Sequence, residues 1–466
     1  MRTAFGFPCH WCLRGLLILF LTLAVSHAAD KGSPWVGLAR RDITPETPIR
    51  LAGYAGRTRP ADKVDAPLLA QALAFKNPAG ERFVFVALDN CEVSHPFVQP
   101  VLEQVLAKFQ LPIGAVAVVS SHTHSGPVLA DTLPGMPQAP AASEDQQRVQ
   151  NYSGALQSNL VAVVGEALDD VQPAVLEYGV GQARFAMNRR VYRDDKVVFG
   201  DNPDGPVDFD VPVLRVKGTN GVLRAIVFGY ACHGTSVRTG DDWYMVSPEY
   251  MGYTRQLLET HHPGAKALYL TGMGADSDPF PRGPLLEAKR HGVELAGAVM
   301  DVLDHPMAPV RRHLRFAYEQ VELPLVAPPT RAQIEMDVTN RVVSVQQRAK
   351  LYLKLLDEGQ PLPRSLALPI AAVRLGDDLT FLLMGGETVV DYSRRLKRLL
   401  AFDHPWTIGY AYEVPCYIPS ARVIKEGGYE SESSLIYYGL YGPFHPSVED
   451  LLVKRMQTLV AGLRTQ

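Results

Sequence analysis

Residues 115–127 read AVAVVSSHTHSGP, and this stretch decides the fold class. Its first five residues are apolar and three of them are valine, a composition that predicts a buried β-strand. The strand stops at small polar residues that include His122 and His124. Because a Ser-Gly-Pro turn follows, we expect the pair to lie at the carboxyl edge of a sheet, where α/β proteins place their ligands.

The spacing of the two histidines leaves their relation open. If the strand geometry persists, side chains two residues apart point to the same face, and both histidines could reach one centre. If the chain turns there, His122 and His124 need not act alike. The alternative without chemistry is a pair of satisfied polar residues at a strand end, so the rest of the chain must supply partners for a functional site.

Length and charge exclude few classes of protein. The chain has 466 residues, of which 47% are hydrophobic and 20% charged, as is ordinary for a globular protein. Two or three domains, or one large α/β unit, are compatible with this length. A net charge of −3 without blocks of like charge gives no indication of a nucleic-acid partner.

The N-terminus has the pattern of a secretory signal. Arg2 and Arg14 precede the apolar run LLILFLTLAV, and the small residues that follow suit cleavage after Ala28 or Ala29. A retained membrane anchor is the alternative, but the run is short for a span. We therefore predict a signal peptide in residues 1–29 and an exported chain, secreted or periplasmic, with no later transmembrane segment. Residues 30–466 are predicted to form one domain.

Five cysteines are too few and too scattered for a disulfide framework. Cys9 and Cys12 lie in the signal region, which leaves Cys91, Cys232 and Cys416. An odd number permits at most one bridge. Whether Cys232 pairs with Cys416 stays open, and small buried packing is the commoner role of such residues.

Three later strands also end in residues suited to chemistry. The strand predicted at 222–230 is followed by His233, and a buried strand at 266–274 opens into the Asp-Ser-Asp turn at 276–278. A further strand delivers Glu387 after two glycines. Turn chemistry alone also favours Asp and Ser in such positions.

Helical patterns alternate with these strands and predict an α/β fold with mixed β-sheets flanked by helices, with a metal site at the carboxyl ends of strands. An exposed helical excursion is expected over residues 330–356, and the Pro/Ala-rich loop at 131–147 could act as a lid. The predicted helices are 97–109, 147–171, 248–261, 285–303 and 446–463.

Three polar residues outside the strand-end turns have two interpretations each. Asp89 ends a predicted strand and is either a carboxylate behind the site or a cap of the helix that begins near Ser94. Arg189 and Arg190 follow the strand at 174–183 and either contact an anion or a carbonyl group or lie in a solvated turn.

Histidine, histidine and carboxylate form the ligand set of catalytic zinc, which keeps one position for water and lowers the pKa of that water to roughly 7. The candidate ligands are scattered over about 265 residues, so no local spacing rule applies. The residues by themselves therefore leave a metal site and a set of structural polar groups as alternatives.

An ordered series of motifs gives a resemblance that covers nearly the whole mature chain. The motifs are SSHTHSGP, MNRR, YACHGTS, GADSDP, GGE and YIPSARVIKEGGYES. This series is similar to the neutral/alkaline non-lysosomal ceramidases, specifically to their N-terminal catalytic domain and its shorter bacterial relatives. Such a series in order is more specific than any single motif.

The resemblance implies one zinc ion per chain, held by His122, His233, Glu387 and Tyr417. It also implies that His124, Arg189 and Tyr429 surround the scissile amide. The twelve-residue interval between Tyr417 and Tyr429 is that of the family. Hydrogen-bond donors to a developing oxyanion, the role expected of His124 and Tyr429, are typically worth about 3 kcal/mol each.

Two departures from the family pattern change the expected mechanism. Asp278 falls where the larger ceramidases carry a serine, and Ser277 is displaced by one residue. A carboxylate that positions water is therefore expected in place of a covalent serine mechanism. The chain also ends soon after the tyrosine region, so we expect the C-terminal β-sandwich of the large enzymes to be missing, and membrane docking by that domain is not assumed.

The resemblance predicts an exported, zinc-dependent amidohydrolase that cleaves an N-acyl amide of a small molecule or lipid, with ceramide as the substrate by analogy. A zinc hydrolase of another amide, an ester or a lactone is one alternative, in which Arg189 or Arg190 would select an anionic group. The other alternative is a non-catalytic exported binding protein of the same fold.

Overall fold

The computed structural model describes residues 35–136, 143–310 and 314–464. The predicted signal peptide at 1–29 and the middle of the predicted Pro/Ala-rich loop lie outside these ranges. No helix within them combines the length and the apolar character that spanning a membrane requires.

A large mixed sheet forms the first half of the core. Its strands run in the spatial order β12-β10-β9-β6-β1-β3-β4-β5, and β14 pairs with β6. The pairs β4–β5 and β10–β12 are parallel, whereas the other pairs in this sheet are antiparallel. The strand bounds are β1 (Trp35–Asp42), β3 (Leu69–Lys76), β4 (Arg82–Leu88), β5 (Val116–Ser120), β6 (Gln172–Gln182), β9 (Asp210–Gly218), β10 (Leu223–Tyr230), β12 (Lys266–Thr271) and β14 (Ala308–Val310).

A second sheet packs face to face on the first. It consists of β15 (Leu314–Pro324), β16 (Ser365–Leu375), β17 (Leu379–Met384) and β19 (Pro405–Ile408), in that order. Alternate side chains of both sheets fill the space between them, because successive residues of a strand point to opposite faces. The rings of Phe85 and Phe381 meet across this interface at 5.0 Å, and Trp406 lies 5.2 Å from Phe381.

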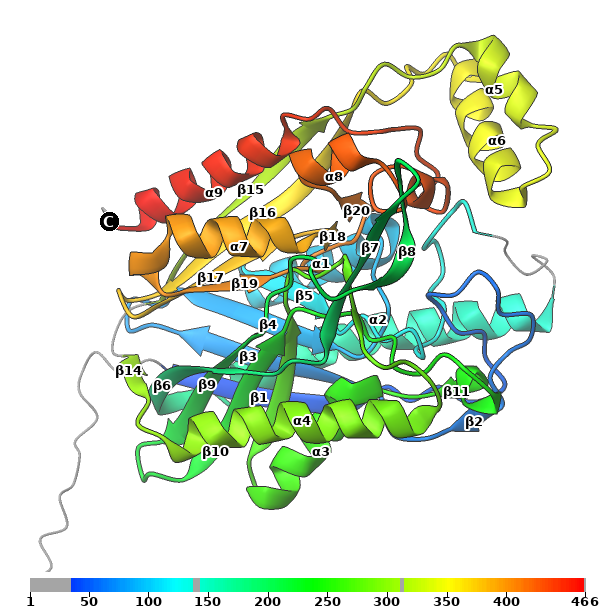
Figure 1. Cartoon of the computed structure of the whole chain (residues 1–466). Coiled ribbons are helices and arrows are strands. Elements are labelled where there is room, and N and C mark those ends of the chain that lie inside the picture. The colour runs from blue at the N-terminus through cyan, green and yellow to red at the C-terminus, as the bar shows by residue number, and fades with distance from the viewer. Residues whose placement is uncertain (1–34, 137–142, 311–313, 465–466) are drawn as a thin grey trace, which may run out of the picture.

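Helices cover the two outer faces, which gives four layers in the order α-β-β-α (Figure 1). One half of the large sheet is covered by α1 (His95–Phe109) and α2 (Glu144–Asp169), the other half by α3 (Glu249–His261) and α4 (Leu285–Asp304). On the second sheet lie α7 (Val390–Leu399) and α9 (Val448–Arg464). The predicted α/β class, with mixed sheets flanked by helices, is confirmed.

The expected helical excursion consists of α5 (Arg331–Asp337) and α6 (Val343–Asp357), which stand apart from the layers (Figure 1). These helices have a small cluster of their own around Ile334, Ala349 and Tyr352. The remaining elements are β2 (Lys63–Val64), β7 (Ala186–Arg193), β8 (Lys196–Asn202), β11 (Met245–Val246), β13 (Ser277–Pro279), β18 (Glu387–Thr388), β20 (Tyr417–Ile418), α8 (Ala421–Glu426) and the 3₁₀ turns at 241–244, 401–403 and 433–436.

The two edges of the large sheet meet where β5 and β12 end. Thr271 donates a hydrogen bond of 2.7 Å from its Oγ1 to the carbonyl oxygen of Ser120. The second layer joins at the same place, since the amide of Tyr412 donates to the carbonyl oxygen of Val118 at 2.7 Å. Strand ends that lie far apart in the order of the sheet are thereby brought together.

The prediction that Asp89 caps the helix near Ser94 is wrong. Ser94 itself caps α1, accepting a hydrogen bond from the amide of Phe97. Asp89 instead forms a buried two-point ion pair with Arg255, at 2.7 and 2.5 Å. Its role is to join β4 to α3, and it does not line the cavity described below.

Two further expectations are settled by the fold. Arg189 and Arg190 lie in strand β7, only 6% and 4% exposed, so the solvated turn is wrong. Three cysteines of the described chain are buried and free: Cys91, Cys232 and Cys416. Cys232 and Cys416 therefore do not form a disulfide.

Candidate functional site

His122 and His124 take different directions because the chain turns between them. Strand β5 ends at Ser120, and His122 adopts a φ of 60°, in the left-handed region that residues other than glycine seldom occupy. The two imidazole rings stand nearly perpendicular, with centroids 4.7 Å apart. Of the two geometries compatible with the H-x-H spacing, the structure has the one in which the histidines differ in orientation.

The four residues implied as metal ligands converge on one point. The carboxylate Oε2 of Glu387 lies 3.2 Å from Nε2 of His122 and 3.3 Å from Nε2 of His233. The phenolic oxygen of Tyr417 lies 3.3 Å from the same nitrogen of His233. Parallel pairing of β18 with β20 sets Glu387 directly beside Tyr417, and all four side chains are buried.

The donor set fits a metal ion. His122 holds its Nδ1 2.8 Å from the carbonyl oxygen of Cys91, which places the ring hydrogen there and leaves a lone pair on Nε2. Nε2 of His233 is an acceptor too, because Arg189 donates to it at 3.1 Å. Together with Glu387 Oε2, three buried acceptor atoms therefore face one another. Each is reached from outside by a neighbouring donor, and a cation among them would satisfy all three at once.

Distances and protonation agree with this interpretation. Nitrogen and oxygen ligands at about 2.0–2.2 Å from a tetrahedral zinc ion lie roughly 3.3–3.6 Å from one another, close to the separations found among His122, His233, Glu387 and Tyr417. Burial, and then the charge of Arg189, lower the pKa of His233 to about 4. The imidazole is therefore neutral at pH 7, as metal ligation requires.

A second cluster of potential ligands, Cys91, His122 and His124, lies beside the first. Burial is the main cause that holds the pKa of the Cys91 thiol well above its ordinary value, with the neighbouring carboxyl group of Glu92 second. A protonated thiol is a poor ligand. The ring nitrogen of His122 that faces Cys91 is also engaged by a carbonyl oxygen, so the cluster around Glu387 is the better candidate.

A cavity of about 280 Å³ opens above these donors. His233 is fully buried behind the wall, and the other predicted site residues line the cavity: His122, His124, Arg189, Asp278, Glu387, Tyr417 and Tyr429. Aromatic side chains, among them Tyr54, Phe199 and Trp243, form part of the remaining walls, together with charged ones, Glu92, Arg238 and Arg282. The structure thus brings all eight residues of the predicted site to one place.

His124 presents an N–H group to the centre of the site. Its Nε2 lies 3.1 Å from Nε2 of His122, and because the latter carries a lone pair, the hydrogen belongs to His124. Burial, and then His122 and His233, hold the pKa of His124 well below its ordinary value, so the ring is neutral. Gly53, at a φ of 87°, touches the other edge of this ring.

We expect Gly53→Ala to lower kcat by ~10- to 100-fold, because a Cβ at this position would lie 2.3 Å from Nδ1 of His124 and would displace the ring. Metal content should stay unchanged. Gly80→Ala is the matched control, since Gly80 also has a positive φ, of 94°, but a Cβ added there would meet no heavy atom within 4 Å. Steady-state kinetics of both variants check the prediction, and equal effects of the two would contradict it.

Arg189 and Arg190 share one carboxylate, that of Glu430, but only Arg189 reaches the cavity. The guanidinium of Arg189 donates to Tyr417 Oη at 3.1 Å and to Glu430 at 2.9 Å, and it packs over the ring of Phe199. Arg190 pairs with the other oxygen of Glu430 and donates to the carbonyl oxygen of Gly427, and it does not line the cavity. The prediction that Arg190 selects an anionic substrate is therefore wrong. Arg189 is the arginine that faces the cavity.

Asp278 faces the cavity, whereas Ser277 does not. Asp278 accepts a hydrogen bond of 3.2 Å from Oγ1 of Thr235 and pairs with Arg282 at 2.6 Å. Burial would raise the pKa of Asp278, but Arg189, Arg282 and the hydrogen bond from Thr235 are among the neighbours that together outweigh it, and the pKa falls to about 2. A carboxylate that is ionised at neutral pH therefore faces the cavity at this position.

The sequence did not indicate several residues of the site, among them Tyr438 and Glu92. Tyr438 donates a hydrogen bond of 2.5 Å to Glu387 Oε1, and Oε2 of Glu92 lies 3.1 Å from the same phenol. Burial, and then the charge of Glu387, raise the pKa of Glu92 well above its ordinary value. Glu92 had a usable signal, because it follows β4, the parallel neighbour of β5. Tyr438 lies in an irregular tyrosine-rich segment and had none.

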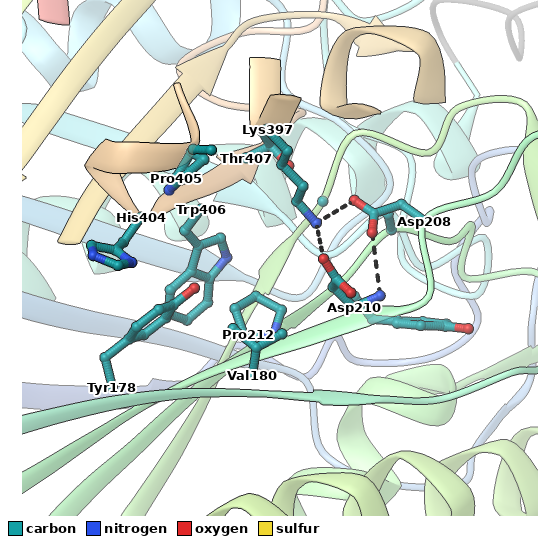
Figure 2. Close-up of a pocket in the computed structure, with 14 residues that line it drawn as sticks. Tyr178, Val180, Asp208, Asp210, Pro212, Lys397, His404, Pro405, Trp406 and Thr407 are labelled. Carbon is teal, nitrogen blue, oxygen red and sulfur yellow. Dashed lines mark hydrogen bonds and ion pairs between the residues drawn. The ribbon is translucent and has the colours of Figure 1, made fainter. Parts of the chain in front are cut away.

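Another cavity, of about 270 Å³, lies between β6, β9, α7 and β19. Figure 2 shows Lys397 between Asp208 and Asp210, which it contacts at 2.6 and 2.8 Å. The ammonium group is thus already paired with both carboxylates. None of the predicted site residues lines this cavity, so the chemistry of the chain is assigned to the first one.

The fold and the buried donors define the class: an α/β protein with a candidate metal centre in a cavity at the ends of its strands. Residues 35–276 match the profile of the family described as neutral/alkaline non-lysosomal ceramidase, N-terminal. The chain belongs to this family.

Individual relatives agree with the assignment. The chain is similar to neutral ceramidase B of Dictyostelium discoideum, with 25% identity over 270 residues that cover 53% of this chain and 36% of the relative. It is also similar to a neutral ceramidase of Oryza sativa subsp. japonica, 33% identical over 25% of this chain and 15% of the relative. The matched segments thus span well under two thirds of these relatives.

The fold is shared with a solved structure. The crystal structure of neutral ceramidase from Pseudomonas aeruginosa superposes with a TM-score of 0.71 and 19% identity, covering 94% of this chain and 75% of that one. A structure described as ceramidase complexed with C2 gives a TM-score of 0.69 and 18% identity, over 93% and 76% of the two chains.

Proposed function

We propose that this protein is a zinc-dependent amidohydrolase that cleaves an N-acyl amide, with a ceramide-like lipid as the substrate class. The observation that carries the proposal is the convergence of His122, His233, Glu387 and Tyr417 beneath a cavity that His124, Arg189, Asp278 and Tyr429 also line or adjoin. The names of the relatives supply the substrate class.

The four converging residues would hold the ion. Two imidazole nitrogens favour zinc over calcium or magnesium, which prefer oxygen ligands. Burial, and then the charge of Glu387, raise the pKa of the Tyr417 phenol well above its ordinary value, and Arg189 offsets only part of this rise. A bound cation would supply the remaining stabilisation that a phenolate needs. When bound in such a site, zinc polarises a carbonyl group and lowers the pKa of water to roughly 7.

The residues of the chain itself would stabilise the charge that develops on the amide oxygen. His124 presents Nε2–H toward the centre of the site. Tyr429 lines the same cavity, and burial raises the pKa of its phenol, so that it keeps its proton and can donate. Fixed donors of this kind act strongly in a buried site because they need no reorganisation during the reaction.

Asp278 would orient the attacking water as a hydrogen-bond acceptor. Thr235 and Arg282 fix its carboxylate, and its pKa of about 2 keeps it ionised without making it a strong base. Alignment of water is therefore the role that its environment supports. Asp278 lines the cavity and Ser277 does not, which supports Asp278 in this role.

Metal analysis and substrate hydrolysis test the proposal together. Purified protein should contain close to one zinc per chain, and it should release fatty acid from fluorescent N-acyl sphingosine faster than from simple N-acyl amines, acyl esters or lactones. Asp278→Ala should lower this release with zinc retained. A folded, metal-free protein would sink the proposal, and a zinc protein inactive on every substrate would favour the binding-protein alternative.

Export and domain organisation are part of the proposal. Residues 30–466 would act as one catalytic unit after removal of the N-terminal segment. Sequencing the N-terminus of the exported protein should give Ala29 or Asp30 as the first residue. An intact Met1 on exported protein would contradict cleavage.

A further inference from the structure

The two oxygens of Glu387 have different surroundings. Oε2 faces the nitrogens of His122 and His233, at 3.2 and 3.3 Å. Oε1 points the other way and accepts the hydrogen bond of 2.5 Å from Tyr438. Because this bond occupies Oε1, the carboxylate cannot rotate without breaking it, and a single oxygen is left for a metal.

The phenolic oxygen of Tyr438 also contacts Glu92. Oε2 of Glu92 lies 3.1 Å from this oxygen, and the Glu92 side chain is buried. A phenol has only one hydrogen, and the shorter of its two contacts is to Glu387. The contact with Glu92 is then a hydrogen bond only if Glu92 is protonated and donates to the phenolic oxygen. Two hydrogen bonds would thus run in series, from Glu92 to Tyr438 and from Tyr438 to Oε1 of Glu387.

We propose that Tyr438 and Glu92 are positioning residues that hold Glu387 as a one-oxygen ligand. This inference rests on the metal centre of the proposed function. Partners of this kind that orient a ligand typically account for 10- to 100-fold in metal affinity. Neither residue would touch the metal, so both act through Glu387.

Zinc affinity, measured by competition with a chromophoric chelator, tests the inference without an activity assay. Tyr438→Phe should bind zinc ~10- to 100-fold more weakly than wild type. The matched control is Tyr437→Phe, since Tyr437 lines the same cavity but makes no hydrogen bond to Glu387 in the part of the chain that the structure describes. This control should bind zinc as wild type does.

Variants of Glu92 test the direction of the hydrogen bond. Glu92→Gln keeps a donor and should retain affinity within ~3-fold, whereas Glu92→Ala should weaken zinc binding ~10-fold or more. The visible spectrum of the Co²⁺-substituted protein should change in Tyr438→Phe and Glu92→Ala, because the coordination of Glu387 changes. Thermal unfolding of the metal-free variants verifies that each is folded.

The outcomes separate this inference from the function on which it rests. Wild-type protein that binds no zinc would overturn the metal centre itself. Wild-type protein that binds zinc, with Tyr438→Phe and Tyr437→Phe equal in affinity and in Co²⁺ spectrum, would overturn the positioning role alone. Equal loss in Glu92→Gln and Glu92→Ala would overturn the donor role of Glu92.

Discussion

Replacement of His122 by alanine is expected to remove zinc from the purified protein and to lower kcat/KM by at least ~10³-fold, about 4 kcal/mol of transition-state stabilisation. The same result is expected for His233→Ala. Each substitution removes one of the buried nitrogens that face Glu387 Oε2 and leaves that carboxylate with an incomplete set of partners. Metal analysis after dialysis and steady-state kinetics on the N-acyl sphingosine substrate provide the measurements.

His291→Ala is the control for this pair of variants. His291 is also a buried histidine, but it bonds to Ser236 and stacks on Phe185, away from the cavity. It should retain zinc. If His122→Ala kept its zinc and activity while remaining folded, the assignment of the metal site would be wrong.

A second large loss of activity is expected when His124 is replaced, but in this variant zinc should stay bound. His124→Ala should lower kcat by ~10²- to 10³-fold, because it removes a donor to the developing oxyanion. Zinc should be retained, and KM should change little, since the lost hydrogen bond strengthens only in the transition state.

This result would distinguish the two histidines of the H-x-H pair. Loss of zinc in His124→Ala would place His124 among the ligands and contradict the role of donor. Tyr429→Phe provides an independent comparison, because Tyr429 lines the cavity as the other proposed donor. It should also lower kcat while zinc is retained.

The strands and the places where they deliver polar residues could be predicted from the sequence. Buried apolar runs followed by His122 and His233 had the length and composition of strands, and β5 and β10 are found there. What the pattern could not give is the stacking of two sheets or the meeting of β5 with β12, because these depend on contacts between distant segments.

The details of the site were harder to predict for local physical reasons. The different directions of His122 and His124 follow from the left-handed backbone at His122, which no side-chain pattern shows. Only Arg189 faces the cavity, and this could not be predicted because adjacent charges suggested a turn where the structure has strand β7. Tyr417 came from the family resemblance, since tyrosine is an unusual zinc ligand, and Tyr438 came from the structure alone.

The meeting of the two sheet edges also has a consequence for how the protein folds. The four candidate ligands are spread over about 300 residues and come together only when β5, β10 and the β18–β20 pair are all in place. An unfolded chain would therefore bind zinc weakly, and the ion would act as a ligand of the native state. At 100 times its dissociation constant, such a ligand adds about 2.7 kcal/mol to the free energy of unfolding. Zinc supply would then set the stability of the folded protein as well as its activity.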